Sequence, residues 1–232
     1  MTMVFAPEKF FDLSEFEHKA LFEDVENVWE VLGDPLKEYI ISHLKPGLHG
    51  KVMDGAFLED EGTIHIGEGT VVEPGAYIKG PTIIGRNTRV RQGAYIRGSV
   101  IVGDKCVVGH TTEIKGAVML NGSQAGHFAY IGDSILGNHV NLGAGTKLAN
   151  LKMIEGSVKV RYGEEKIDTG LRKFGAIIGD HCELGCNSVT SPGTIFGKNC
   201  IVYPCTPVSG VFEDNSIIKF KPNIEVSERR ER

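Results

Sequence analysis

Three basic residues recur at a fixed interval along this chain of 232 residues. Lys79, Arg97 and Lys115 are 18 residues apart, and each directly follows an aliphatic residue. If the fold stacks them, like charges held close together repel, so the series would bind an anion such as a phosphate group. The alternative is an exposed column that the nearby carboxylates of Glu73 and Glu113 neutralise. The spacing alone leaves both interpretations open.

A histidine and a tyrosine lie three residues apart in the segment AGHFAYIGD, residues 125–133. Imidazole has an ordinary pKa near 6.5 and accepts a proton at neutral pH, so His127 is a candidate general base. The alternative is a polar residue at a kink in the backbone. A six-residue rhythm fails between Leu120 and Leu136. We predict that this break re-aims His127 and Tyr130 toward the basic residues.

The elements that position these residues follow the same six-residue period. A constant period of six in a β-rich sequence predicts a parallel β-helix, in which three hexapeptides form one coil of 18 residues. The 30 glycines permit tight corners. The three basic residues would then stack about 4.8 Å apart on one face. An ordinary sandwich or barrel gives no reason for constant spacing. The aliphatic series runs through Ile66, Val72, Ile78, Ile84, Val90, Ile96, Val102, Val108 and Ile114, resumes at Leu136, Leu142 and Leu148, and continues from Ile178 to Val208.

Residues 1–50 differ from this pattern and read as helical. Ser14 and Glu17 have the spacing of a capping box, and Pro35 suits the first turn of a second helix that ends near Leu44. We predict that this segment is a helical cap over the first coil. The apolar residues at helical spacing are Leu21, Val25, Val28, Trp29 and Leu32.

The remaining chain divides into three parts. Residues 51–222 form the predicted β-helix, and residues 223–232 form a charged tail. Residues 152–172 interrupt the repeat, and alternation on both sides of 163–165 predicts a β-hairpin.

The cysteines favour core packing over metal binding. Cys106, Cys182 and Cys200 occupy the fifth place of a hexapeptide, where a small, half-buried residue fits. Cys182 and Cys186 form a C-x₃-C pair with no second pair to complete a zinc site. The eight histidines include no closely spaced pair within the repeats, which argues against a zinc carbonic anhydrase. We therefore expect no metal site.

Composition excludes several classes of protein. The net charge is −5 and the isoelectric point is near 5.9, so we expect no nucleic-acid partner. No apolar run reaches the roughly 18 residues of a membrane span, and the first residues lack the pattern of a signal peptide. We expect a cytoplasmic protein without a membrane partner.

Residues 122–150, GSQAGHFAYIGDSILGNHVNLGAGTKLAN, resemble a known family. The segment is similar to the acetyltransferase half of the bifunctional N-acetylglucosamine-1-phosphate uridyltransferase/glucosamine-1-phosphate N-acetyltransferase, a hexapeptide-repeat transferase. The resemblance covers roughly residues 60–210 and implies an all-β fold, a left-handed parallel β-helix.

The resemblance also implies roles for individual residues, with His127 as the catalytic base beside Asn141 at the sugar amine. The positions that hold the sugar phosphate match Arg97, Lys115, Tyr130 and Lys173. The positions that contact acetyl-CoA match Ala144, Asn150, Cys186 and Pro204. Three of the acetyl-CoA positions depart from the family, because Leu151 stands for a tyrosine, Cys186 for a serine and Pro204 for an alanine. Lys219 or Lys221 would replace an arginine of the family's C-terminal arm.

The function that follows from the resemblance is transfer of an acetyl group from acetyl-CoA to glucosamine 1-phosphate, a step toward UDP-N-acetylglucosamine. The chemistry needs no metal. Family members are trimers, so a homotrimer is expected. The uridyltransferase half is not in this sequence, so a separate nucleotidyltransferase is an expected partner. Galactosamine 1-phosphate and a nucleotide-linked amino sugar remain alternative acceptors. The competing interpretation is a non-catalytic β-helix that assembles or regulates a sugar-nucleotide enzyme.

Overall fold

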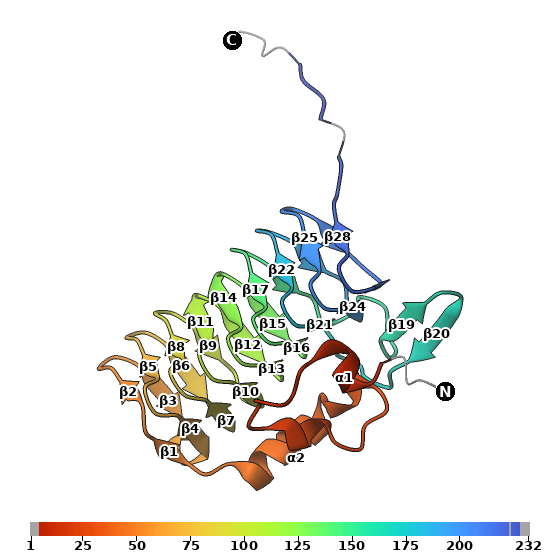
Figure 1. Cartoon of the computed structure of the whole chain (residues 1–232). Helices are drawn as coiled ribbons and strands as arrows, with labels where there is room; N and C mark the ends of the chain where they lie inside the picture. Colours follow the sequence, from red (N-terminus) through yellow and green to blue (C-terminus); the bar gives the residue numbers. More distant parts are fainter. Residues whose placement is uncertain (1–4, 223, 228–232) are drawn as a thin grey trace.

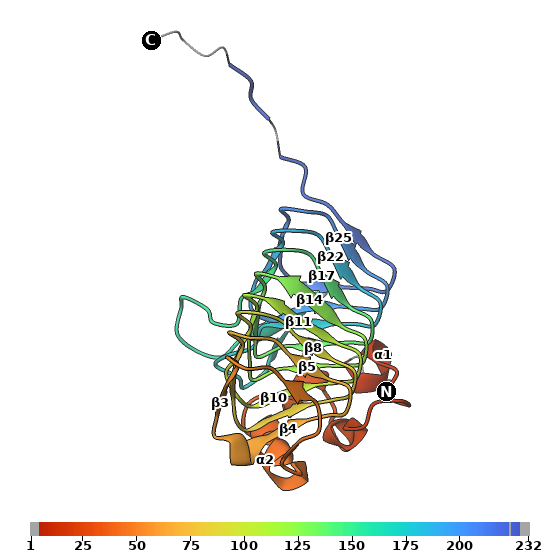
Figure 2. The ribbon, with the colours of Figure 1, turned by 90° about the vertical axis from the view of Figure 1, so that its left-hand side faces the viewer.

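Three parallel β-sheets wind about one axis and enclose a hydrophobic core (Figure 1). The computed structural model describes residues 5–222 and 224–227. Neighbouring strands of one sheet come from successive coils, and each sheet forms one side of the stack of coils seen in Figure 2. The parallel β-helix predicted from the six-residue period is therefore confirmed.

The strands are short, as the hexapeptide repeat requires. The first sheet, sheet A, contains β1 (Gly47–Leu48), β4 (Ile64–Ile66), β7 (Thr82–Ile84), β10 (Val100–Val102), β13 (Val118–Met119), β16 (Ile135–Leu136), β21 (Ala176–Ile178), β24 (Thr194–Phe196) and β27 (Val211–Phe212). Sheet B contains β2 (Lys51–Val52), β5 (Val71–Val72), β8 (Arg89–Val90), β11 (Val107–His110), β14 (Gln124–His127), β17 (Asn141–Leu142), β22 (Glu183–Leu184), β25 (Ile201–Val202) and β28 (Ile217–Ile218). Sheet C contains β3 (Phe57–Glu59), β6 (Tyr77–Lys79), β9 (Tyr95–Ile96), β12 (Glu113–Lys115), β15 (Tyr130–Gly132), β18 (Lys147–Leu148), β23 (Val189–Thr190) and β26 (Pro207–Val208).

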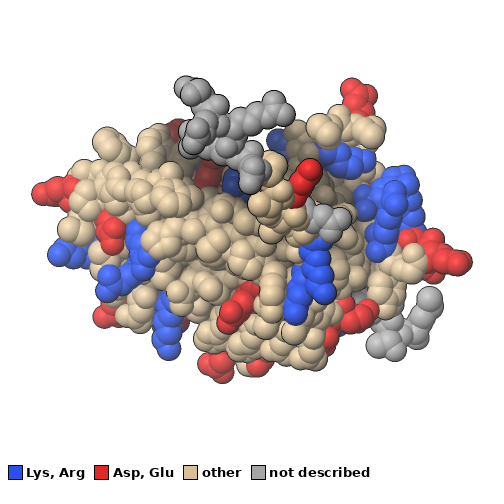
Figure 3. Space-filling view, turned by 90° about the horizontal axis from the view of Figure 1, so that it is seen from above, with Lys and Arg blue, Asp and Glu red and all other residues tan. Residues whose placement is uncertain are grey.

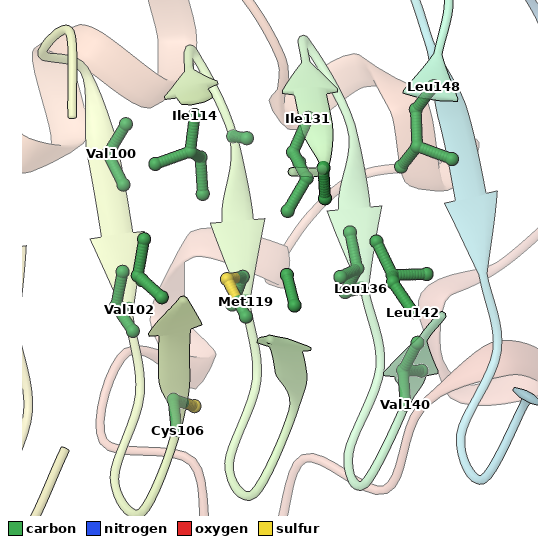
Figure 4. Close-up of a cluster of buried hydrophobic side chains, with 14 of the residues drawn as sticks. Val100, Val102, Cys106, Ile114, Met119, Ile131, Leu136, Val140, Leu142 and Leu148 are labelled. Carbon is green, nitrogen blue, oxygen red and sulfur yellow. The ribbon is translucent and has the colours of Figure 1, made fainter. Parts of the chain in front are cut away.

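The aliphatic residue of each hexapeptide points into the coil and stacks on its counterparts in the coils before and after (Figure 4). Ile114, for example, pairs with Ile96 on one side and Ile131 on the other, and all three are fully buried. Stacking of like side chains at strand spacing removes a continuous apolar column from water. The predicted core series is confirmed from Ile66 to Val208.

The interruption near residues 125–133 lies elsewhere than predicted. Successive inward residues are six apart through this segment, except for two steps of five at the corner between sheets C and A. The segment that carries His127 and Tyr130 is therefore in register, and the predicted re-aiming by a break is wrong. Met119, not Leu120, is the inward residue of its strand. The inward residues concerned are Ile114, Met119, Ala125, Ile131 and Leu136.

The three cysteines at the fifth place are buried, as expected. The Cys106 thiol donates to the carbonyl of Leu120 at 3.1 Å, and Cys182 donates to Gly197 at 3.0 Å. Thr88, at the same place in another coil, uses its hydroxyl in the same way, donating to Gly103 at 2.9 Å. Burial raises the pKa of the Cys106 thiol to about 12, so this group stays protonated and fills space at the corner.

The N-terminal segment lies along the outer face of sheet A rather than over the first coil (Figure 1). Its aromatic and aliphatic residues form a second core with the outward side chains of the sheet. The predicted end cap is therefore wrong in its position. The outward residues that it covers are Ile83, Ile101, Val118, Ile135, Ile177 and Ile195.

The secondary structure of that segment agrees with the sequence in part. The second predicted helix is present as α2 (Asp34–His43). The first is wrong: the chain forms α1 (Pro7–Phe10) and two 3₁₀ turns, η1 (Lys19–Phe22) and η2 (Val28–Val31). A third 3₁₀ turn, η3 (Glu61–Thr63), lies within the coils. The expected capping box is absent, because no helix begins at Ser14: its backbone N–H donates to Asp12 at 3.0 Å, and the Glu17 carboxylate pairs with Arg86 at 3.3 Å.

The predicted hairpin is confirmed as β19 (Lys159–Tyr162) and β20 (Glu165–Asp168), which pair antiparallel. The N-terminal segment forms an outer layer on sheet A, called the N-terminal layer below. The inner face of the hairpin packs on this layer through Val158 and Val160, which are fully buried. The predicted charged tail includes residues 223 and 228–232, which lie outside the described residues. Within the described part of the chain, no helix is long and apolar enough to cross a membrane.

Candidate active site

The predicted base and three predicted acetyl-CoA positions form one column at the corner between sheets B and C. His127 ends β14 and pairs with His110 of the coil before it. The registers Ala125↔Leu142, Leu142↔Leu184 and Leu184↔Val202 place the residues two positions further on in the same order along the corner. Successive members lie about 4.8 Å apart. The column therefore runs His110, His127, Ala144, Cys186 and Pro204.

His127 differs from His110 in what its ring can do. The Nδ1–H of His110 donates to the carbonyl of Gln92 at 2.9 Å, and its Nε2 accepts from the Thr111 hydroxyl at 3.2 Å. The exposed His127 ring has no hydrogen-bond partner among residues 5–222 and 224–227. Both ring nitrogens of His127 are therefore available to a ligand, whereas those of His110 are already used.

The backbone beside His127 is fixed by the next coil. The carbonyl of His127 accepts from the N–H of Gly145 at 3.0 Å. Phe128 then adopts a left-handed conformation with φ 53°, which turns the chain from sheet B into sheet C. The Ala144 N–H, next to Gly145, makes no hydrogen bond within the described residues. It is a free donor one coil away from the His127 ring.

A polar network occupies the opposite edge of sheet C, at its corner with sheet A. Lys115 donates to both carboxylate oxygens of Asp133, at 2.9 and 3.2 Å. The amide of Asn150 also donates to Asp133, and the Tyr130 hydroxyl donates to the Asn150 side-chain oxygen at 3.3 Å. Asp133 and Asn150 are buried. Two predicted phosphate-binding residues, Lys115 and Tyr130, are therefore held by one network.

The network leaves no room for a side chain at Gly132. A Cβ at Gly132 would lie 2.7 Å from both the Tyr130 hydroxyl and the Asn150 amide nitrogen. Gly132 pairs with Lys115 and stands where the next basic residue of the series would be. The basic series therefore ends at Gly132, because the side chains of Tyr130 and Asn150 occupy the space that a fourth basic side chain would need.

Each residue of the basic series has a carboxylate partner. Lys79 pairs with Glu59 at 2.5 Å and Arg97 with Glu113 at 2.7 Å. The hydrogen bond to Glu113 raises the pKa of the Arg97 guanidinium. The neutralised column is the arrangement in this structure, with Glu59 and Asp133 as partners in addition to the expected Glu113. The expected Glu73 carboxylate instead accepts from the backbone N–H of Gln92 at 2.9 Å.

Asp133 is the site residue that the sequence analysis missed. The available signal was an acidic residue directly after the glycine that ends the basic series, in the sequence Tyr130–Asp133. Its φ of 44° is left-handed, which turns the chain sharply after β15. The carboxylate then lies beside Lys115 of the coil before.

The other predicted site residues, Asn150, Asn141 and Lys173, lie outside the column that contains His127. Asn150, expected beside acetyl-CoA, lies with Lys115 and Tyr130 instead of in the Ala144 column. Asn141 is exposed on the outer face of sheet B. Lys173 is exposed and pairs with Leu151 across an antiparallel bridge. Asn141 and Tyr130 therefore face outward from different sheets.

The side chains that could bind a metal ion do not cluster in the described part of the chain. Within residues 5–222 and 224–227, no three His, Cys, Asp or Glu side chains are close enough together to hold a metal ion. Cys186, which extends the His127 column, is an exposed free thiol.

The coil is similar to hexapeptide-repeat proteins that are already known. Residues 78–167 match the model described as the GMPPB C-terminal domain, and residues 175–203 match the hexapeptide repeat of succinyl-transferase. The bifunctional protein GlmU of Methanococcus aeolicus is 32% identical over 209 residues, which are 90% of this chain and 50% of that protein. This chain is similar to GlmU and contains hexapeptide repeats. It spans about half the length of that protein.

One further relative and one solved structure are also similar to this chain. The bifunctional sugar-1-phosphate nucleotidylyltransferase/acetyltransferase of Sulfurisphaera tokodaii is 42% identical over 86 residues, which are 37% of this chain and 21% of that protein. The UDP-N-acetylglucosamine acyltransferase of Francisella novicida has a similar fold, with a TM-score of 0.52 and 19% identity over 70% of this chain and 59% of that one. The resemblance to hexapeptide-repeat transferases noted in the sequence is thus confirmed.

Proposed function

We propose that this chain transfers an acetyl group from acetyl-CoA to the amine of an amino-sugar phosphate, with glucosamine 1-phosphate as the leading acceptor. The observation that carries the proposal is the position of His127. Its unpartnered ring belongs to the column that continues through Ala144 at one edge of sheet C, and the network around Lys115 and Tyr130 lies at the other edge of the same sheet. The names of the bifunctional relatives support this class of reaction.

The proposed chemistry begins with the acceptor amine, because an ammonium group has no lone pair for attack. The acceptor therefore reacts as the free amine, after its ammonium form has lost one proton to water. The neutral amine attacks the thioester carbonyl of acetyl-CoA, and His127 takes the next proton from the nitrogen as the C–N bond forms. The Ala144 N–H, which has no partner among the described residues, donates to the oxyanion of the tetrahedral intermediate. The C–S bond then breaks, and the imidazolium returns the proton to the leaving thiolate. Atoms and charges balance with no metal in the step.

The phosphate of the acceptor would displace carboxylates from the basic series. Arg97 and Lys115 are ion-paired with Glu113 and Asp133, and a dianionic phosphate competes for the same donors. Tyr130 and Lys173 complete the phosphate site. On the donor side, Cys186 and Pro204 extend the column along which the coenzyme would lie, and Lys219, 4.5 Å from the Tyr203 ring, replaces the family's arginine.

Arg97→Ala tests the phosphate assignment. Loss of one charge-assisted contact should raise the KM for glucosamine 1-phosphate roughly 10-fold or more, with a smaller effect on kcat. The same variant should leave the KM for acetyl-CoA unchanged. Steady-state kinetics with each substrate varied in turn measures both values. Equal KM values for the sugar phosphate in the variant and the natural chain would exclude Arg97 from the site.

We propose a homotrimer, which the placement of the proposed residues supports. Asn141 and Tyr130 point away from different sheets, so an acceptor that touches both requires a second copy of the chain. Sheet C also exposes an aromatic column of Phe57, Tyr77 and Tyr95, which suits self-association. Light scattering on the purified protein should give three times the chain mass of 25.2 kDa. A monomeric mass with full activity would contradict a site shared between copies.

The second candidate is a non-catalytic subunit of a sugar-nucleotide enzyme. The ion pairs along the basic series favour it, since the column is electrostatically satisfied without a ligand. A subunit of this kind would show no turnover alone and would bind a separate nucleotidyltransferase.

A further inference from the structure

The hairpin insertion forms one wall of a cavity of about 490 Å³ against the coil. Four basic side chains line it: Lys152, Lys159, Arg161 and Lys166. Figure 3 shows blue side chains gathered at the right-hand end of the molecule, the end at which Figure 1 places β19 and β20. The hairpin segment also carries Glu164, Glu165 and Asp168, but only its basic side chains line the cavity.

The charges on the hairpin are only partly compensated. Lys159 pairs with Asp168 at 3.5 Å on the neighbouring strand. Arg161 lies directly opposite Lys166 in the hairpin register, and neither has an ion-pair partner among the described residues. Like charges opposite one another on paired strands destabilise the hairpin unless an anion lies between them. Burial of Val160 on the other face fixes these side chains on the outer one.

The cavity adjoins the proposed phosphate site along the corner between sheets C and A. Pro192, which lines the cavity, lies one coil beyond Asn150 at the same place in the coil. Asn150 accepts the Tyr130 hydroxyl, and the next residue, Leu151, bridges to Lys173. A ligand held by its phosphate at Tyr130 and Lys173 would therefore reach the cavity along the same corner.

The lining also offers an apolar surface beside the cations. Met153 and Ile154 line the cavity and are among the most exposed aliphatic residues of the described chain. A ligand with phosphates at one end and a planar ring at the other would contact both kinds of surface. A volume of this size fits a small organic ligand rather than one inorganic ion.

We propose that the hairpin cavity binds a nucleoside diphosphate group. Arg161 and Lys166 hold the diphosphate, and the base lies against Met153 and Ile154. This inference extends the proposed function, because it makes a nucleotide-linked amino sugar an acceptor in addition to the sugar 1-phosphate. The amine would still be at His127, and the nucleotide would extend from the phosphate site into the cavity.

Titration calorimetry of the full chain with UDP at low salt tests this proposal. The natural chain should bind UDP, and added salt should weaken the binding. Arg161→Gln with Lys166→Gln should lower the affinity at least about 10-fold, since two charge-assisted contacts are lost. Lys37→Gln with Arg89→Gln removes the same charge from exposed positions elsewhere and should leave the affinity unchanged.

The proposal would be overturned if the natural chain did not bind UDP at millimolar concentration, or if both double variants bound UDP equally well. Coenzyme A is itself a nucleotide with a diphosphate. The proposal would also be overturned if Arg161→Gln with Lys166→Gln lowered the affinity for coenzyme A and left the affinity for UDP unchanged. Turnover of glucosamine 1-phosphate is measured separately. Its absence would contradict the proposed function, whereas absence of UDP binding would contradict only the cavity.

Discussion

His127→Ala should lower kcat by about 10²- to 10⁴-fold, the usual contribution of a general base. The imidazole accepts a proton only in the transition state for attack, so KM values should change little by comparison. The ring is exposed and has no hydrogen-bond partner among the described residues, so its removal leaves no buried polar group unpaired. The unfolding temperature should therefore stay within a few degrees of the natural chain.

His110→Ala is the matched control for that variant. His110 occupies the same place one coil earlier, and both of its ring nitrogens already have partners in Gln92 and Thr111. Its loss should change kcat by a factor of only a few. If both variants lose activity equally, the corner matters for structure and His127 has no special chemical role.

Trp29→Ala should lower the free energy of unfolding by about 3–5 kcal/mol, the range for truncating a buried large aromatic residue. Trp29 is 2% exposed, and its ring lies 4.9 Å from Phe5 and 6.1 Å from Phe174, centroid to centroid. Phe174 directly follows Lys173, at the end of the insertion. Because this contact joins the N-terminal layer to the coil, the variant should unfold in a single transition at a lower urea concentration.

Ile41→Ala is the control for the N-terminal layer, because Ile41 on α2 is 59% exposed and should cost under about 0.5 kcal/mol. Urea denaturation followed by circular dichroism measures both variants. A Trp29→Ala protein with a first transition that leaves the β-helix intact would show that the layer is an independent domain.

The interior of the coil was predictable because a single geometric rule governs it. Each hexapeptide places one aliphatic residue inward, so the period determines the core, the strand pairing and the 18-residue stacking of Lys79, Arg97 and Lys115. The same rule places Ala144 and Cys186 in register with His127. Between Ile114 and Leu136 it failed where two coils are one residue shorter at the corner between sheets C and A, and at the two ends of the coil the spacing changes to 20 and 16 residues.

The N-terminal layer was less predictable because tertiary packing overrode a local pattern. Val25, Val28 and Leu32 have helical spacing, yet Val28–Val31 forms only a short turn that is stabilised by contact with sheet A. A signal for this packing exists in the repeats themselves. In three strands of sheet A the residue just before the inward one is an isoleucine: Ile83, Ile101 and Ile177. A strand that faced solvent would carry a polar side chain at this position.

The polar network could be predicted only in part. The resemblance identified Lys115, Tyr130 and Asn150, but assigned Asn150 to the coenzyme. Its hydrogen bonds to Asp133 and Tyr130 depend on how one coil lies on the next, which residue spacing in a single sequence does not specify.

The most direct test of the proposed transfer is product formation by the purified chain with acetyl-CoA and a panel of three acceptors: glucosamine 1-phosphate, galactosamine 1-phosphate and UDP-glucosamine. We expect one equivalent of free coenzyme A thiol for each equivalent of N-acetylated product identified by mass, with glucosamine 1-phosphate turned over by the natural chain and at least about 10²-fold more slowly by His127→Ala. No N-acetylated product from any of the three acceptors, in a protein of the expected fold and mass, would contradict the proposed acetyltransferase function.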